Sequence, residues 1–284
     1  MRWERGRRSE NVEDRRGIGI GRGSAIGGGG LLVLVVVTML LGGNPEDVLR
    51  VVTGAQTNVS TESGPQLSED ADPQAQFVSV VLADTEDTWD QLFASAGRQY
   101  RHPKLVLFSD QVSSACGFAS AAVGPFYCAN DERVYIDLAF YNDLRTRFGA
   151  DGDFAQAYVI AHEVGHHVQN LLGIMEQVHQ QLARLPESEA SVVSVRLELQ
   201  ADCFAGVWGH HANTQRKLLE EGDVEEGLNA AAAIGDDRIQ RMSRGRVAPE
   251  QWTHGSSAQR VRWFRRGLDT GRIDNCNTFE ASSL

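Results

Sequence analysis

The residues best suited to carry chemistry are two histidines and a glutamate near the middle of the chain, in the order His162-Glu163-Val164-Gly165-His166. Residues four positions apart lie on one face of an α-helix, one turn above the other. His162 and His166 can therefore offer two imidazole nitrogens to a single metal ion. Glu163 lies beside them, where its carboxylate can act as the base for an attacking water. This spacing is that of a catalytic zinc helix, but the same pattern also occurs by chance on solvated helix surfaces.

A zinc hydrolase usually needs a third protein ligand, and two arrangements compete for that role. A third histidine six residues after the second is excluded, because that position holds Leu172. His167 is excluded as well, since it points about 100° away around the helix. The second arrangement uses Glu198 on a later helix, with Asp202 four residues further along the same helical face. Asp202 can then accept the N–H of a ligating imidazole, which fixes its tautomer and makes it a better donor.

The neighbours of Glu198 predict a largely buried helix rather than a charged surface. They are Leu197, Leu199, Ala201, Phe204 and Ala205. Buried carboxylates require partners, and a metal ion supplies one. We therefore predict one Zn²⁺ per chain, bound by His162, His166 and Glu198. The alternative for Glu198 is a surface charge on an amphipathic helix.

Helices and a few short strands must position these side chains. Residues 154–172 form the predicted metal-binding helix, and the helix that carries Glu198 is predicted from about 186 to 210. Hydrophobic periodicity predicts further helices at 85–100, 139–148, 228–243 and 258–268, and strands at 105–108, 126–128 and 134–138. The predicted fold class is α+β, mainly helical with a small sheet, preceded by one transmembrane helix.

The strand at 134–138 has two possible roles beside a metal-binding helix. It could pair with an extended substrate through main-chain hydrogen bonds. It could equally be an ordinary strand inside the sheet, and both interpretations stay open.

The charge of the chain is unevenly distributed. Its 284 residues carry a net charge of −11, which disfavours nucleic-acid binding. Residues 1–24 have the opposite balance, with seven arginines against four acidic residues. A basic head and an acidic body are typical of a chain that crosses a membrane.

An uncharged run from 23 to 43, with an apolar centre at 31–41, supports this interpretation. About 20 apolar residues span a bilayer. No Ala-x-Ala cleavage site follows the run, so we predict a signal-anchor helix rather than a cleaved signal peptide. The arginine excess puts residues 1–22 in the cytoplasm as a basic, polar and disordered tail. Residues 44–76 then form a flexible linker, and 77–284 form the metal-binding domain on the extracytoplasmic side.

The four cysteines of the chain allow three pairings. None forms a Cys-x-x-Cys metal pair. We favour Cys116–Cys128, which would staple a local loop, and Cys203–Cys276, which would tie the C-terminus to the helix of Glu198. Both bonds require an oxidising compartment outside the cytoplasm, and the alternative is four buried thiols.

Taken together, the motifs resemble the bacterial family of "putative neutral zinc metallopeptidases". They are residues 124–128, 134–138, 162–169, 198–203 and 253–260. The resemblance implies a short cytoplasmic tail, one transmembrane helix and a zincin-like metalloprotease domain that acts on a peptide or protein substrate. The downstream Glu-x-x-x-Asp is similar to that of thermolysin-like gluzincins, in which the Glu binds zinc and the Asp supports a ligand.

Amide hydrolysis also needs a group that stabilises the developing oxyanion. His254 is the first candidate, because it lies in a polar Gly/Ser-rich stretch before the last predicted helix. Tyr158 and Tyr135 are weaker candidates. A helix-capping or surface role explains His254 equally well.

Two other functions compete with a membrane-anchored zinc peptidase in which Glu163 is the base. The domain could be a non-catalytic, zinc-stabilised binding module at the cell envelope. Structural zinc sites, however, usually have four protein ligands and many cysteines, and they have no use for a glutamate at the base position. An intramembrane protease is excluded, because the metal helix lies far from the apolar run.

Overall fold

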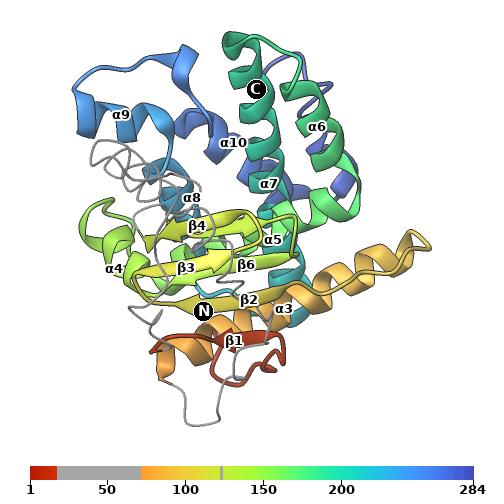
Figure 1. Cartoon of the computed structure of the whole chain (residues 1–284). Helices are drawn as coiled ribbons and strands as arrows, with labels where there is room; N and C mark the ends of the chain where they lie inside the picture. Colours follow the sequence, from red (N-terminus) through yellow and green to blue (C-terminus); the bar gives the residue numbers. More distant parts are fainter. Residues whose placement is uncertain (18–71, 122–123) are drawn as a thin grey trace, which may run out of the picture. The chain divides into compact units, whose positions relative to one another are not determined.

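The computed structural model describes residues 1–17, 72–121 and 124–284. Four of its strands form one sheet in the order β1-β2-β6-β5 (Figure 1). β1 pairs with β2 and β2 with β6 in parallel, whereas β5 is antiparallel to β6. The strands are β1 (Val12–Asp14), β2 (Lys104–Phe108), β5 (Phe126–Cys128) and β6 (Arg133–Asp137). The two central strands are buried at nearly every position, as expected for strands that are covered on both faces.

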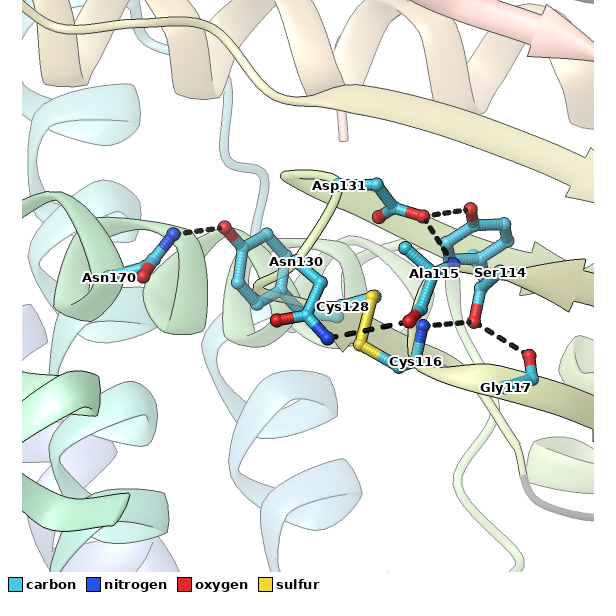
Figure 2. The surroundings of a disulfide bond; sticks show 10 residues. Ser114, Ala115, Cys116, Gly117, Cys128, Asn130, Asp131 and Asn170 are labelled. Carbon is cyan, nitrogen blue, oxygen red and sulfur yellow. Dashed lines mark hydrogen bonds between the residues drawn. A yellow bond between two sulfur atoms is a disulfide. The ribbon is translucent and has the colours of Figure 1, made fainter. Parts of the chain in front are cut away.

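A hairpin of β3 (Gln111–Ser114) and β4 (Gly117–Ser120) forms a second, two-stranded sheet. Figure 2 shows how Cys116, in its turn, is bonded to Cys128 at the end of β5. The side chain of Asp131 accepts a hydrogen bond of 3.0 Å from the backbone of Ala115 and so supports the same junction.

Helices make up most of the described residues, so the predicted mainly helical α+β class is confirmed. They are α3 (Pro73–Ser95), α4 (Ala139–Thr146), α5 (Asp153–Leu171), α6 (Ile174–Leu182), α7 (Glu187–Arg216), α8 (Asp223–Ala233), α9 (Asp236–Arg244) and α10 (Ser257–Thr270), with short 3-10 turns η2 (Pro249–Gln251) and η3 (Ile273–Cys276). α3 begins before the predicted domain boundary at Phe77. The Asp72 carboxylate caps it by accepting from the backbone N–H of Ala75 at 3.0 Å.

α5 is buried along almost its whole length and packs against α3, α7 and α8. Two glycines allow the backbones of neighbouring helices to approach closely. A Cβ at Gly165 of α5 would lie 2.9 Å from the carbonyl oxygen of Ala201 on α7. A Cβ at Gly267 of α10 would overlap the carbonyl oxygen of Cys203, also on α7. These contacts hold α5, α7 and α10 together at the level of the metal-binding motif.

Both predicted disulfides are confirmed. Cys116 is bonded to Cys128, and Cys203 on α7 is bonded to Cys276 in η3. The second bond attaches the C-terminal turn to the helix that carries Glu198, as predicted.

The prediction that residues 1–22 form a disordered tail is wrong for residues 1–15. They belong to the same compact unit as residues 72–284. Val12 is 1% exposed, and Trp3 packs edge-on against Phe77 of α3. The composition of this segment suggested disorder because its partners lie far away in the sequence.

The predicted transmembrane helix at 23–43 lies outside the described residues, as does most of the predicted linker at 44–76. Within the described ranges 1–17, 72–121 and 124–284, no helix combines the length and apolar character needed to cross a bilayer.

Candidate metal centre

Two imidazoles from α5 and one carboxylate from α7 converge at the point where these helices meet. Nε2 of His162 lies 3.2 Å from Oε2 of Glu198, and Nε2 of His166 lies 3.5 Å from the same oxygen. One ligand atom from each residue lies within 4.8 Å of the other two. The structure therefore brings together the three residues that were predicted as ligands from two separate segments.

The remaining ring nitrogens are held by hydrogen-bond acceptors. Nδ1 of His162 lies 2.8 Å from Oδ1 of Asp202, and Nδ1 of His166 lies 2.8 Å from Oε1 of Gln169. Each Nδ1 therefore carries the proton in the neutral ring, which leaves the Nε2 lone pair to face Glu198. Asp202 has the predicted position behind a ligand. Gln169 was not predicted, although it follows His166 by three residues and so shares its helical face.

This donor set fits a zinc ion. Two imidazole nitrogens and one carboxylate oxygen are common zinc ligands, and three protein ligands leave a position for water or substrate. Both Nε2 atoms face the carboxylate of Glu198. The site can therefore hold a divalent cation without any rearrangement of the residues behind it.

Behind the site lies a fully buried ion pair that sequence reasoning missed. Nε of Arg260 donates to Oδ2 of Asp202 at 2.9 Å, and one terminal nitrogen donates to Oδ1 at 2.9 Å. The same nitrogen lies 3.1 Å from the hydroxyl of Tyr158, which in turn donates to Asp202 at 2.5 Å. Arg260 lies within a stretch that had been singled out as a motif, but its spacing gave no indication of its partner 58 residues away.

The contacts around Asp202 shift the pKa values of both Asp202 and His162. Burial raises the pKa of Asp202, but the charges of Arg260 and His162 outweigh this and lower it to about 2. Burial likewise lowers the pKa of His162, yet the Asp202 carboxylate reverses the effect and raises it to about 10. The imidazole of His162 thus binds a proton tightly when no cation is present. Binding of a metal ion through Nε2 of His162 would require the release of that proton.

Replacement of Asp202 by Asn tests its supporting role. In the native protein the negative charge of Asp202 orients His162 and makes its imidazole more basic. The uncharged amide of Asn lacks this effect, so we expect zinc affinity to fall ~10–100-fold. Competition with a chromogenic chelator would measure the affinity. Asp269→Asn, at an exposed position on α10, is the control. Equal affinities in the two variants would remove Asp202 from the metal centre.

A cleft of about 680 Å³ opens beside the three ligands. Glu163, the predicted base, lines it together with His162, His166 and Glu198. Its walls are more apolar than polar. The apolar side chains include Phe126, Phe140, Phe148, Val159, Met175, Leu182 and Leu197, and the polar ones include Asp143, Arg147 and His179. The cleft is thus a place where an apolar chain segment could meet both the metal ligands and Glu163.

His254 also lines this cleft, at a distance of 56 positions in sequence from Glu198. The loop that carries His254 is held by Asp236, whose Oδ2 accepts hydrogen bonds from the backbone N–H groups of Thr253, His254 and Gly255. Burial lowers the pKa of His254, but the carboxylates of Glu198 and Asp236 outweigh it and raise the pKa above its usual value. These two carboxylates therefore stabilise the protonated form of the His254 imidazole.

The two tyrosines considered as oxyanion stabilisers are not available for that role. The hydroxyl of Tyr158 is buried and committed to Asp202. The hydroxyl of Tyr135 donates to Asp131 at 2.8 Å, and its ring stacks on Phe126. Neither residue is part of the cleft lining.

Of the two roles left open for strand 134–138, the structure shows the ordinary sheet strand, because β6 already has a neighbour on each side. β2 pairs along one edge and β5 along the other. The outermost strand on this side of the four-stranded sheet is β5, and its residues Phe126 and Tyr127 line the cleft. Sequence periodicity identified both strands but could not establish their order.

His167 does not take part in the metal centre, as predicted. His167 points away from the ligands: Nε2 donates to the carbonyl of Arg101 at 2.6 Å, and Nδ1 accepts from Tyr127 at 2.9 Å. Burial lowers the pKa of His167 to about 4, so it is neutral near pH 7. His179 is exposed and also lines the cleft.

A His-Glu-x-x-His motif on a buried helix, a carboxylate on the next long helix and an adjoining cleft define a class of protein: mainly helical, with a site that could hold a metal ion. The chain belongs to the family described as "Putative neutral zinc metallopeptidase", whose model matches residues 1–279.

Relatives of the chain occur in Escherichia coli and in Mycobacterium tuberculosis. "Uncharacterized protein YpfJ" of Escherichia coli strain K12 is 49% identical over 288 residues, which cover 99% of this chain and 100% of the relative. "Uncharacterized protein Rv2575" of Mycobacterium tuberculosis strain H37Rv is 44% identical over 218 residues, which cover 73% of each chain. No solved structure matches the chain.

Proposed function

We propose that this protein is a zinc-dependent metallopeptidase in which one Zn²⁺ is bound by His162, His166 and Glu198 and Glu163 is the general base. The observation that carries the proposal is the convergence of both Nε2 atoms on the Glu198 carboxylate beside a cleft that Glu163 also lines. Membership of a family described as zinc metallopeptidases supports the same class of reaction.

Each of the protein's own groups has a defined task in this reaction. Zinc, when bound, supplies a Lewis acid that polarises the substrate carbonyl and acidifies water. Glu163 accepts the proton of the attacking water and later delivers it to the leaving amine. His254, which lines the same cleft, donates a hydrogen bond to the oxyanion that develops on the substrate carbonyl.

Substrate binding would use β5 and the walls of the cleft. As the outermost strand on this side of the sheet, β5 can add an extended peptide through main-chain hydrogen bonds. The apolar side chains of the walls favour substrates with apolar side chains near the cleaved bond. We also propose that the domain works outside the cytoplasm, since two disulfides persist only in an oxidising compartment.

The competing function is a zinc-stabilised binding module without catalysis. Such a site would be closed by a fourth protein ligand. Among the residues that the structure describes, three ligand atoms meet at this point, and the cleft lies next to them. These features favour catalysis over a purely structural metal.

Metal content and turnover test the proposal together. The full-length protein is expected to contain one zinc per chain and to cleave components of a diverse peptide mixture, and a chelator should stop cleavage. Glu198→Ala is expected to lose the zinc, because two imidazoles alone leave the ion one protein ligand short. Zinc content would be measured by plasma mass spectrometry, and cleavage by peptide mass spectrometry. Unchanged zinc in Glu198→Ala would eliminate Glu198 as a ligand.

The role of His254 has its own test. His254→Ala is expected to lower kcat ~10²–10³-fold, with KM and zinc content little changed, because the lost hydrogen bond forms only as the oxyanion develops. His179→Ala, which removes another histidine of the cleft lining, is the control. A kcat equal to that of the control variant would leave His254 a loop residue without a part in catalysis.

A further inference from the structure

The N-terminal segment, residues 1–15, is bonded to the edge of the main sheet. Its strand β1 runs parallel to β2, with Val12 opposite Leu105 and Asp14 opposite Leu107 (Figure 1). The backbone N–H of Leu105 donates to the carbonyl of Asn11 at 2.8 Å, and that of Arg15 donates to the carbonyl of Leu107 at 2.8 Å. Without this strand, β2 would present an unpaired edge on this side.

Side chains of the N-terminal segment also donate hydrogen bonds to a buried carboxylate, that of Glu86. Glu86 on α3 is 1% exposed, so its carboxylate needs partners. The hydroxyl of Ser9 donates to it at 2.5 Å, the amide of Asn11 at 2.8 Å and the guanidinium of Arg7 at 2.9 Å. Three residues of the N-terminal segment therefore converge on one carboxylate of α3.

Several of the N-terminal arginines thus have partners within the protein. Arg7 pairs with Asp87 at 2.7 Å as well as with Glu86, and Arg15 pairs with Glu13 at 2.6 Å. Arg8 donates to the side chain of Gln76 on α3. These contacts account for Arg7, Arg8 and Arg15, which are part of the arginine excess that suggested a tail retained in the cytoplasm.

We propose that residues 1–15 and residues 72–284 lie on the same side of any membrane that the protein meets and form one folding unit. A single crossing between them would separate β1 from β2 by ~30 Å, the thickness of the hydrocarbon core. Paired strands lie only ~4.8 Å apart. If the apolar run at 23–43 enters a bilayer, the chain must therefore return to the side from which it came. This inference does not depend on the peptidase activity.

Cross-linking in the full-length protein tests the contact. Arg7 and Asp87 are both exposed and within hydrogen-bond distance, and all four native cysteines are in disulfides. The variant carrying Arg7→Cys and Asp87→Cys would be expressed in bacteria with a protease site inserted between residues 60 and 61. Whole cells would be treated with a short, membrane-permeant bis-maleimide, and the protein would then be cut. The fragments are expected to remain joined in most molecules, whereas a mixture of the two single variants gives only separate fragments. If the fraction of joined fragments in the double variant is no higher than in the mixture of single variants, the proposal is overturned.

Thiol labelling tests sidedness without disturbing the contact. Arg5 and Asp269 are exposed and lie in the two segments. Arg5→Cys and Asp269→Cys, in separate proteins, would be treated in intact spheroplasts with a membrane-impermeant maleimide, and total reactivity would be measured after lysis. In intact spheroplasts, we expect the impermeant maleimide either to label the thiols of both variants or to label neither. Labelling of one and protection of the other would place the segments on opposite sides and refute the inference.

Discussion

Replacing Glu163 with Gln is expected to abolish peptide hydrolysis while leaving zinc bound. Glutamine has nearly the same shape as glutamate, so the cleft and the three ligands His162, His166 and Glu198 should remain in place. Its amide cannot accept the proton of an attacking water, and loss of a general base costs ~10²–10⁴-fold in rate. The measurement is kcat/KM on a peptide that the unsubstituted enzyme cleaves, together with zinc content per chain.

The control for this experiment is Glu176→Gln, an exposed glutamate on α6. It is expected to retain both zinc and activity. Full activity in Glu163→Gln would eliminate Glu163 as the base. If the unsubstituted protein contains one zinc but cleaves nothing in a diverse peptide mixture, the binding-module interpretation would replace the peptidase.

The second large effect, a loss of stability and of zinc affinity, is expected when Arg260 is replaced. The sequence motifs alone did not place this residue at the metal centre. Arg260→Leu would leave the fully buried carboxylate of Asp202 without its bidentate partner. Removing one member of a buried ion pair typically costs ~3–5 kcal/mol, because the other charge stays buried and uncompensated. The free energy of unfolding, measured by denaturant titration, should fall by that amount, and zinc affinity should fall with it.

Two further variants separate this effect from a general loss of charge. Arg265→Leu removes an exposed arginine from the same helix and is expected to change stability little. Arg260→Lys keeps the positive charge but loses the two parallel hydrogen bonds, so its stability should lie between those of Arg260→Leu and the unsubstituted protein. If Arg260→Leu is as stable as Arg265→Leu, the ion pair does not hold the metal centre together.

The metal ligands themselves could be predicted from the sequence because their geometry is local. The helical repeat alone places His162 over His166 and Glu198 over Asp202. Hydrophobic neighbours then indicated that both helices are buried, and buried carboxylates need partners. The fold class followed from the same periodicities, and the disulfide partners followed from which cysteines could staple a local loop or anchor the C-terminus.

Contacts between distant segments could not be predicted in this way. Arg260 meets Asp202 across 58 residues, and nothing in a helical repeat identifies which of many arginines turns inward. The order of the strands could not be predicted either, so the sequence left open whether β6 has a free edge for a substrate; β2 and β5 occupy both of its edges.

The N-terminal segment is the clearest case of what only the tertiary structure decided. By itself it is short, polar and rich in arginine, and a strand of three residues has too few apolar side chains to show a period. Its stabilisation comes from the edge of β2 and from the buried charge of Glu86, both about 70 to 90 positions further along the chain. Local periodicity determined the metal-binding motif, whereas pairing between remote segments determined how that motif is supported and how the N-terminal segment joins the sheet.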